Sequence, residues 1–283
     1  MTSPSPPDLL LEPIVRAALA EDLGRAGDIT TDAVIPADAT ARVAFAVREP
    51  GIIAGLDCAR LAFSLLNPKL DFRIVVPDGN RVGAGEVIAT CSGPARSILS
   101  AERVALNFVA QLSGVASATA GIVRAISHTK AKLTCTRKTV PGLRTLQKYA
   151  VRTGGGVSHR FGLDDAVLIK DNHIAIAGGV GVAVRRAKQA TGHLVKIECE
   201  VETLEQLDEA LDAGADALLL DNMSIQTLRQ AMKLIKNRAI AEASGRVTPQ
   251  TAPEIAEAGV DLISAGWLTH SAPALDIGLD FVA

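Results

Sequence analysis

The chain is short of aromatic residues: Phe, Trp and Tyr make up 3% of its 283 residues. So few aromatic rings argue against a surface that stacks the bases of single-stranded nucleic acid. Charge of one sign is also lacking, because 29 Lys and Arg residues face 31 Asp and Glu residues and leave a formal net charge of -2. No global field therefore favours a polyanion, and a multiply charged anion must be met by local clusters of cations.

Cysteine is scarce as well. The four cysteines, Cys58, Cys91, Cys135 and Cys199, are scattered without a CxxC pair, which is typical of a reduced cytosolic protein and not of a zinc site. The opening residues MTSPSPPDLL lack the basic region and apolar core of a signal peptide, and we find no run of about 18 apolar residues. We expect a soluble, cytoplasmic protein.

The first hundred or so residues predict a separate, β-rich domain. Strand-like runs fall at 41–48, 72–76 and 86–91, and short helices are expected at 12–23 and 57–66. From residue 98 to about 126, apolar residues recur at helical spacing, with an interruption expected near Ser113-Gly114. This helical segment is expected to link the first domain to the rest of the chain.

Beyond Lys130, short apolar runs alternate with helical segments. The runs fall at 133–136, 166–169, 194–197, 217–220, 239–241 and 262–264, and helices are expected at 203–213, 225–235 and 252–258, with Thr203, Ser224 and Thr248 as N-caps. Such alternation with short connections predicts a parallel sheet. An Ala-Gly-x-Asp motif, which is typical of a helix end followed by a strand start, precedes both Leu218 and Leu262. This repetition favours a barrel over a doubly wound sheet. Six strands fall short of eight, so we predict an incomplete α/β barrel.

The residues that follow these runs should share one mouth of the barrel. In chain order they are Arg137-Lys138, Lys170-Asp171-Asn172-His173, Glu198 and Glu200, Asp221-Asn222, Ser244-Gly245 and Ala265-Gly266. Cations come first, carboxylates next and small residues last. Carboxylates beside an amide suit a Mg²⁺ ion shared with substrate phosphates, and small residues ahead of a helix suit a phosphate. The alternative is that the carboxylates are strand-end caps or ion-pair partners of Lys170 and Arg137.

Cations gather between Thr134 and His173. Those that we assign to a pocket for a multiply charged anion are Arg137, Lys138, His159, Arg160 and Lys170. Others have a simpler interpretation. The cations Arg144, Lys148 and Arg152 recur every four residues, as one stripe of an exposed helix would, and Glu102-Arg103 has the form of a surface ion pair.

Several longer strings are more specific. They are GDITT, PDGNRVGAGEVI, SAERVALNF, TRKTVPGLR, KYAVRTGGG, HRFGLDDAVLIKDNHI, LLLDN, EASG and GWLTHSAPALDIGLDF, and they span nearly the whole chain. Together they closely resemble the quinolinate phosphoribosyltransferase family. The resemblance implies an N-terminal α/β sandwich domain over residues 1–112, to which the tail 268–283 returns. It also implies an incomplete α/β barrel over residues 113–267 that carries the active site.

The resemblance also implies a function. The family's enzymes are Mg²⁺-dependent pentosyltransferases that transfer phosphoribosyl from phosphoribosyl pyrophosphate to quinolinate. The acceptor loses CO₂, and the products are nicotinate mononucleotide and pyrophosphate, a step of de novo NAD biosynthesis. By carry-over, Arg137, His159 and Arg160 would hold the two quinolinate carboxylates. Arg103 would reach the same carboxylates from the neighbouring subunit of a homodimer.

The remaining carry-over concerns the phosphoribosyl donor. Lys138 would bridge from quinolinate to the donor, and Lys170, Glu200 and Asp221 would face the ribose, the pyrophosphate and Mg²⁺, with the two carboxylates holding the metal directly or through water. Ser244, Gly245 and Gly266 would hold phosphate. These roles are binding and electrostatic, and none is that of a covalent nucleophile.

The chain departs from the family's usual pattern at Val140, Ser158, Arg246 and Trp267. Ser158 and Arg246 flank the implied quinolinate and phosphate positions, where they could alter affinity or selectivity. Three alternatives stay open. One is a ModD-like relative, from a family associated with molybdenum transport, that takes another acceptor. The others are a Schiff-base lyase using Lys138 or Lys170, and a relative that binds ligand without turnover.

Overall fold

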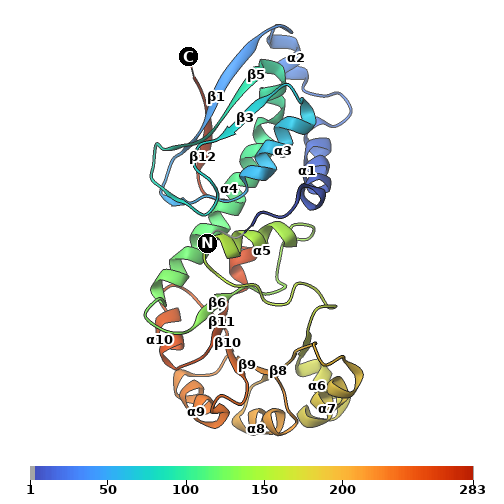
Figure 1. Ribbon diagram of the computed structural model, residues 1–283, viewed down its shortest axis with the longest axis vertical. Coiled ribbons are helices and arrows are strands. Elements are labelled where there is room, and N and C mark those ends of the chain that lie inside the picture. Colours follow the sequence, from blue (N-terminus) through green and yellow to red (C-terminus); the bar gives the residue numbers. More distant parts are fainter. Residues whose placement is uncertain (1–3, 283) are drawn as a thin grey trace. The chain divides into compact units, whose positions relative to one another are not determined.

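The computed structural model describes residues 4–282, which form two compact units (Figure 1). Unit 1 comprises the chain up to Ala120, the segment Thr139–Gly155 and the chain from Leu268 on. Unit 2 comprises Gly121–Lys138 and Gly156–Trp267. The sequence placed all of residues 113–267 in the barrel. The structure differs, because residues 113–120 and the segment Thr139–Gly155 belong to unit 1.

Unit 1 is built on a four-stranded antiparallel sheet in the order β12-β1-β5-β3. The strands are β1 (Thr40–Val47), β3 (Asp71–Ile74), β5 (Val87–Pro94) and β12 (Ile277–Phe281), and a smaller pair is formed by β2 (Gly51–Ile52) and β4 (Arg81–Val82). The helices are α1 (Asp8–Leu23), α2 (Ile29–Val34), α3 (Leu56–Leu66), α4 (Ala95–Ala125, which enters unit 2) and α5 (Arg144–Thr153). The last strand, β12, pairs with β1 in the register Phe45 to Leu279.

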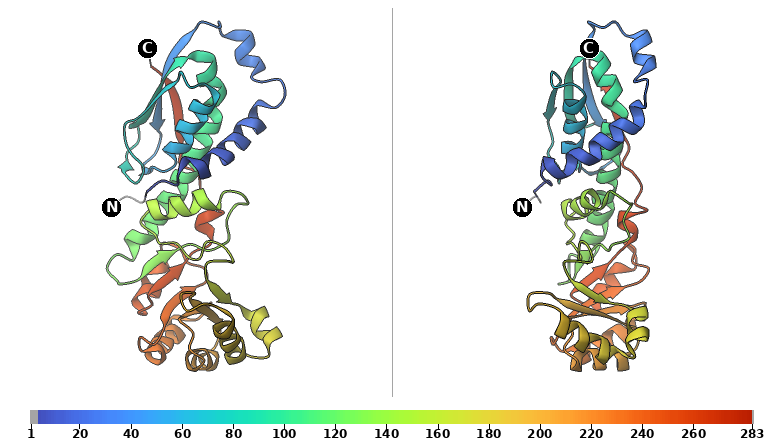
Figure 2. Two further views of the ribbon diagram at one scale, coloured as in Figure 1. Left: turned by 45° about the vertical axis from the view of Figure 1, so that its right-hand side comes forward. Right: turned by 90° about the vertical axis from the view of Figure 1, so that its right-hand side faces the viewer.

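Aromatic packing attaches α3 to this sheet, and helices lie beside the strands (Figure 2). Phe63 of α3 meets Phe45 edge-on with ring centroids 6.0 Å apart and stacks on Phe72 at 5.6 Å. Such aromatic contacts contribute about 0.5–1.5 kcal/mol each beyond the burial of their area. In α1, buried residues recur every four positions at Leu11, Val15 and Leu19, as expected for the inner stripe of an amphipathic helix.

Helix α4 corrects one expectation, because it runs without interruption from Ala95 to Ala125. Gly114 does not break the helix. A side chain there would collide with the backbone of Pro273 and Ala274, so the glycine permits a close approach of the C-terminal segment. By length and composition alone α4 could cross a membrane, in contrast to our reading of the sequence. Its apolar window is 56% buried inside the structure, as in the core helix of a globular protein.

Helix α5 corrects another expectation. The cations on it were interpreted as an exposed stripe, but Lys148 is fully buried, and Arg144 and Arg152 are half-buried. The regular spacing was real, but spacing cannot show what covers a stripe. A hydrogen bond fixes this helix within unit 1: the Tyr149 hydroxyl donates to Asp78 Oδ2 over 2.8 Å. Asp78 also accepts the backbone N–H of Gly55, and its burial raises its pKa.

Unit 2 is a curved sheet of six parallel strands in the order β6-β11-β10-β9-β8-β7. The strands are β6 (Lys132–Thr134), β7 (Val167–Ile169), β8 (Ile197–Val201), β9 (Ala217–Asp221), β10 (Ile240–Ser244) and β11 (Leu262–Ser264). The helices are α6 (Asp171–Ala177), α7 (Val180–Ala190), α8 (Leu204–Asp212), α9 (Ile225–Ile235) and α10 (Ala252–Glu257), and a short 3₁₀ helix, η1 (Trp267–Thr269), follows β11. Helices α7 to α10 lie outside the sheet (Figure 1). The predicted incomplete barrel of six strands is confirmed.

Local signals explain most of these elements. Thr203 and Ser224 cap α8 and α9 as predicted, because their side chains accept the N–H groups of Gln206 and Thr227. The third cap is wrong by one turn: Thr248 begins a turn, and α10 starts only at Ala252. Strand β8 is also shifted. It begins at Ile197, where the predicted run ended, so Glu198 and Glu200 lie inside the strand and not after it.

Candidate active site

Unit 2 contains a cavity of about 510 Å³ at the carboxyl ends of its parallel strands, which we call the strand-end cavity. The residues predicted from the sequence that line it are Arg137, Lys138, His159, Arg160, Lys170, Asp171, Glu200, Asp221 and Ser244. It therefore combines five cationic or imidazole side chains with several carboxylates. Unit 1 holds another cavity of about 370 Å³, but its described lining includes Glu21 and Asp22 and no Lys, Arg or His. Of these two cavities, the strand-end cavity has the lining that suits an anion.

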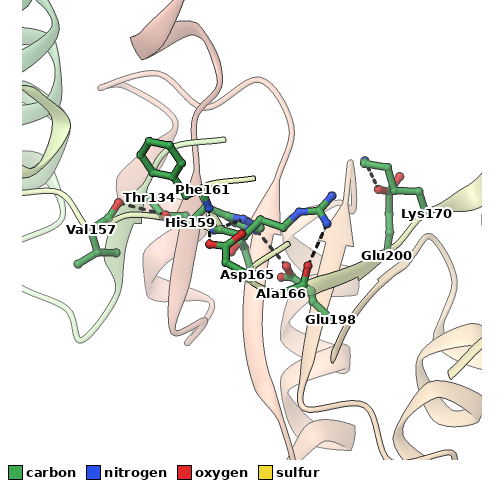
Figure 3. Close-up of polar contacts among 11 residues, drawn as sticks. Thr134, Val157, His159, Phe161, Asp165, Ala166, Lys170, Glu198 and Glu200 are labelled. Carbon is green, nitrogen blue, oxygen red and sulfur yellow. Dashed lines mark hydrogen bonds and ion pairs between the residues drawn. The ribbon is translucent and has the colours of Figure 1, made fainter. Parts of the chain in front are cut away.

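The sheet leaves an opening between its two edge strands, β6 and β7, and the segment 156–160 lies there. We call it the bridging segment. The Val157 N–H donates to the Leu133 carbonyl over 2.8 Å, and the Thr134 hydroxyl donates back to the Val157 carbonyl over 3.2 Å. On the other side, Arg160 Nη1 donates to the Ala166 carbonyl, just before β7, over 3.1 Å (Figure 3). These bonds carry His159 and Arg160 into the cavity.

His159 belongs to a buried cluster with Glu198 and Glu242, which we call the His159 cluster. Its Nε2 lies 2.9 Å from Glu198 Oε2 (Figure 3). The same atom lies 3.7 Å from Glu242 Oε1. The Arg160 N–H donates to His159 Nδ1 over 2.7 Å. Because Nδ1 accepts this bond, Nε2 carries a proton and donates to Glu198. His159 thus orients the backbone that presents Arg160.

Glu242 is the most enclosed member of the His159 cluster, with 3% of its side chain exposed. Burial and the neighbouring Glu198 raise the pKa of Glu242 to about 7, against the smaller opposing effects of His159 and a Ser264 hydrogen bond. Desolvation disfavours a buried carboxylate, and a second carboxylate disfavours it further. Glu242 is therefore substantially protonated near neutral pH.

The two arginines of the strand-end cavity carry unsatisfied donors. The Nε atoms of Arg137 and Arg160 are buried and have no hydrogen-bond partner among the described residues. Burial lowers the pKa of Arg160, and the nearby Arg137 lowers it further. Two guanidinium groups that repel each other, each with an unpaired buried donor, gain from a bound anion, because an unmade buried hydrogen bond costs about 1–3 kcal/mol.

Carboxylates and a lysine occupy the ends of β8 and β9. Lys170 Nζ forms an ion pair of 2.6 Å with Glu200 Oε2 (Figure 3). Glu200 pairs in register with Leu219, so Asp221, two residues further on, projects from the same face of the sheet. Asp221 accepts the side-chain amide of Asn222 over 2.7 Å. Glu200 is thus both an ion-pair partner of Lys170 and part of the lining, so the two interpretations of this carboxylate are compatible.

Family models match most of the chain. The C-terminal domain model of quinolinate phosphoribosyl transferase matches residues 115–280, and the N-terminal domain model of the same family matches residues 28–113. The chain belongs to the quinolinate phosphoribosyltransferase family.

Individual relatives are similar over most of their length. The carboxylating nicotinate-nucleotide pyrophosphorylase of Mycobacterium leprae is 45% identical over 271 residues, covering 94% of this chain and 95% of the relative. The decarboxylating quinolinate phosphoribosyltransferase 2b of Nicotiana tabacum, described as mitochondrial, is 40% identical over 294 residues. The match covers 98% of this chain and 83% of the relative. The structure of the Francisella tularensis nicotinate-nucleotide pyrophosphorylase superposes with a TM-score of 0.94 at 38% identity, covering 99% of this chain and 100% of that one.

Three residues predicted for the site of this quinolinate phosphoribosyltransferase do not line the strand-end cavity. Gly266 lies against it, and a side chain there would press on Lys138 and Thr136. Gly245 adopts a φ of 117° and leaves no room for a side chain beside Asn222. Arg103 is exposed on α4 in unit 1. The two glycines are therefore explained by close packing, whether or not phosphate binds near them.

Trp267, one departure from the family's usual pattern, bonds to the loop that contains another, Arg246. The Trp267 indole N–H donates to the Val247 carbonyl over 2.7 Å and so ties η1 to the loop after β10. Arg246 in that loop is exposed and adopts a φ of 45°, a conformation that glycine takes without strain. The Ser158 side chain is exposed on the bridging segment. Nothing in the structure explains Val140.

Sequence reasoning missed Glu242 and Ser264, which also line the strand-end cavity. Glu242 lies inside β10 and Ser264 is the last residue of β11, so a search restricted to residues after each run passes over both. The available signal was alternation. Glu242 stands two residues before Ser244, which places both side chains on one face of the strand.

We predict that Glu242 makes stability fall as pH rises. Its folded-state pKa of about 7 exceeds the ordinary 4.5, so its stabilising contribution is complete below pH 4.5 and is lost as pH rises through 7. At about 1.4 kcal/mol per pH unit, the loss is at most about 3.5 kcal/mol. Glu242→Gln should therefore gain stability relative to wild type between pH 5 and pH 8, as measured by urea unfolding.

The matched control is Glu202→Gln, which changes an exposed glutamate just after β8. Its difference from wild type should be the same at pH 5 and pH 8. Parallel pH curves for wild type and Glu242→Gln would show that Glu242 is ionised throughout this range.

Proposed function

We propose that this quinolinate phosphoribosyltransferase carries out its reaction in the strand-end cavity. The reaction transfers phosphoribosyl from phosphoribosyl pyrophosphate to the ring nitrogen of quinolinate, and the acceptor then loses CO₂ to give nicotinate mononucleotide. The observation that carries this placement is the pair of buried guanidinium groups of Arg137 and Arg160 with unpaired Nε donors. Guanidinium forks bind both oxygens of a carboxylate, and quinolinate has two carboxylates.

Within the cavity, the two substrates occupy different ends. Quinolinate lies at Arg137 and Arg160, with His159 holding the backbone of Arg160 in place. The donor lies at Lys138, Lys170, Glu200, Asp221 and Ser244, with Gly245 and Gly266 allowing the loops after β10 and β11 to approach its phosphate. The grouping of Glu200 with Asp221 at the donor end is supported by the sheet order, because the two lie on the adjacent strands β8 and β9.

These residues act by electrostatics and positioning. As pyrophosphate leaves, the ribose C1 gains oxocarbenium character, which the carboxylates of Glu200 and Asp221 stabilise. Lys138 and Lys170 neutralise charge that develops on pyrophosphate. The ring nitrogen of quinolinate is already nucleophilic, so no general base is needed for the transfer. Holding both substrates in line can supply several kcal/mol, up to roughly 7–11 in the best intramolecular cases.

A divalent cation fits the donor end. Glu200 and Asp221 offer carboxylate oxygens from one face of adjacent strands, and Asn222 adds an amide, the oxygen ligands that Mg²⁺ prefers. Glu200 and Asp221 would hold the ion directly or through water. When bound, Mg²⁺ would supply charge neutralisation at pyrophosphate.

The assembly and location are also proposed. Arg103 would complete the quinolinate site of a neighbouring subunit in a homodimer, which is supported by the exposure of its side chain on α4. A cytoplasmic, reducing location is supported by the four cysteines, all of which are buried and free.

Replacing Arg137 should weaken quinolinate binding. Arg137→Ala leaves a desolvated substrate carboxylate without its partner, which costs on the order of 2–5 kcal/mol. Calorimetric titration with quinolinate measures the loss. The control is Arg229→Ala, which removes an exposed arginine on α9 outside the cavity. A quinolinate dissociation constant within threefold of wild type for Arg137→Ala would remove that residue from the pocket.

The full reaction should require Mg²⁺. In an assay of quinolinate with phosphoribosyl pyrophosphate, we expect CO₂ and nicotinate mononucleotide in equal amounts, loss of both with EDTA and recovery on adding excess Mg²⁺. Nicotinate in place of quinolinate should give no product. Undiminished turnover in metal-free buffer would contradict the proposed role of Glu200 and Asp221.

A shared site can be tested by complementation. Arg103→Ala and Arg137→Ala proteins should each be inactive, and a mixture should recover part of the activity once subunits exchange, because one hybrid site is then intact. Exchange is followed with two distinguishable affinity tags. Demonstrated exchange without recovery would argue that Arg103 serves its own subunit or no site at all.

A further inference from the structure

The second half of the reaction needs a proton donor, and the roles proposed above assign no residue to it. When the carboxylate at C2 leaves as CO₂, the electron pair of the broken carbon–carbon bond stays on C2, beside the positively charged ring nitrogen. That carbon must then take up one proton to give nicotinate mononucleotide. The donor must line the cavity at the end where carboxylates bind, and it must carry a proton near neutral pH.

Glu242 meets the geometric requirement. It lines the strand-end cavity from the middle of β10, and its Oε1 lies 3.7 Å from His159 Nε2, at the carboxylate-binding end. Two other charged groups of the lining have polar partners of their own. Lys170 is held by Glu200 over 2.6 Å and Asp221 accepts from Asn222, and both lie at the end that we assign to the donor. Glu242 is thus a carboxyl group of the lining that lies beside His159, at the proposed quinolinate site.

The surroundings of Glu242 favour its protonated form. Glu198 faces it from β8 and His159 from the bridging segment, Ser264 hydrogen-bonds it from β11, and Leu219, its register partner on β9, is apolar. The guanidinium groups of Arg137 and Arg160 line the same cavity. Burial beside Glu198 outweighs the imidazole and raises the pKa of Glu242 to about 7.

Substrate binding strengthens this preference. Quinolinate brings two negative charges to the cavity, and an ionised Glu242 would repel them in a desolvated site. A protonated Glu242 instead donates a hydrogen bond. The same carboxyl group is then next to the carbon at which negative charge develops as CO₂ departs.

We propose that Glu242 is the catalytic acid of the decarboxylation step, which rests on the proposed placement of quinolinate in the strand-end cavity. The C2–carboxylate bond breaks and its electron pair remains on C2. The Glu242 O–H bond breaks, its proton forms the new C2–H bond, and its electrons remain on the Glu242 carboxylate. Solvent returns one proton to Glu242 after the product leaves. No oxidant or reductant is required.

The test is a single-turnover experiment with enzyme in excess over carboxyl-labelled quinolinate, at saturating phosphoribosyl pyrophosphate and Mg²⁺. Pyrophosphate, CO₂ and nicotinate mononucleotide are followed separately from pH 6 to pH 9. In wild type, nicotinate mononucleotide formation should fall at high pH, with a midpoint at or above pH 7. In Glu242→Gln, pyrophosphate should appear at near the wild-type rate. Nicotinate mononucleotide formation should slow by roughly 10²- to 10⁴-fold, and its rate should no longer decrease at high pH.

Two further variants separate proton donation from a structural role. Glu242→Asp keeps a carboxyl group and should retain part of the rate together with a fall at high pH. Glu198→Gln removes the other carboxylate of the His159 cluster. The rate of nicotinate mononucleotide formation in this variant should still decrease at high pH, but the midpoint of the decrease should move to lower pH because the neighbouring negative charge is gone.

A measurement of quinolinate binding distinguishes an error in the role of Glu242 from an error in the placement of quinolinate in the strand-end cavity. Glu242→Gln should bind quinolinate within threefold of wild type, whereas Arg137→Ala should not. A Glu242→Gln rate within threefold of wild type, or an unchanged fall with pH, would overturn the role of Glu242. If that variant does not fold, a wild-type rate that stays constant up to pH 9 overturns it equally.

Discussion

The parallel pairing of six strands is the constraint on which the rest of unit 2 depends. Because β6 to β11 all run in one direction, their carboxyl ends meet at one edge, and side chains from widely separated parts of the sequence line one cavity. The order of strands also sorts their chemistry. Cations follow the edge strands β6 and β7, carboxylates lie on β8 and β9, and small residues follow β10 and β11. Cations and carboxylates from different strands are thus brought into one cavity.

The opening between β6 and β7 gives the site its cationic end. A closed barrel would satisfy the edge of β6 with another strand, whereas here the bridging segment bonds to β6 through Val157 and reaches toward β7 through Arg160. The segment is irregular backbone held by hydrogen bonds on both sides. His159 uses both ring nitrogens in this arrangement, so its contribution to anion binding is to position Arg160.

The cavity contains unfavourable like-charge interactions before substrate binds. Arg137 and Arg160 repel each other and keep unpaired buried donors, while Glu198 and Glu242 compete to be the charged carboxylate beside His159. A bound dianion would offset the repulsion between Arg137 and Arg160. It would also favour the protonated form of Glu242 over the ionised form. Binding and the supply of a proton are therefore coupled by the same arrangement of charges, at the cost of a carboxyl group buried where it is poorly solvated.

The sequence by itself determined the order of elements, the incomplete barrel and most of the cavity lining, because apolar periodicity, helix caps and strand-end residues are local signals. Only the tertiary structure decided the contacts between segments that lie far apart in the sequence. It buried Lys148, since the spacing of cations on α5 cannot show what packs over them. It kept α4 straight through Gly114, since the glycine accommodates a distant segment. It brought Glu242 of β10 to Glu198 of β8 and His159, because proximity across a curved sheet depends on strand order and register, which the chain specifies only when it folds.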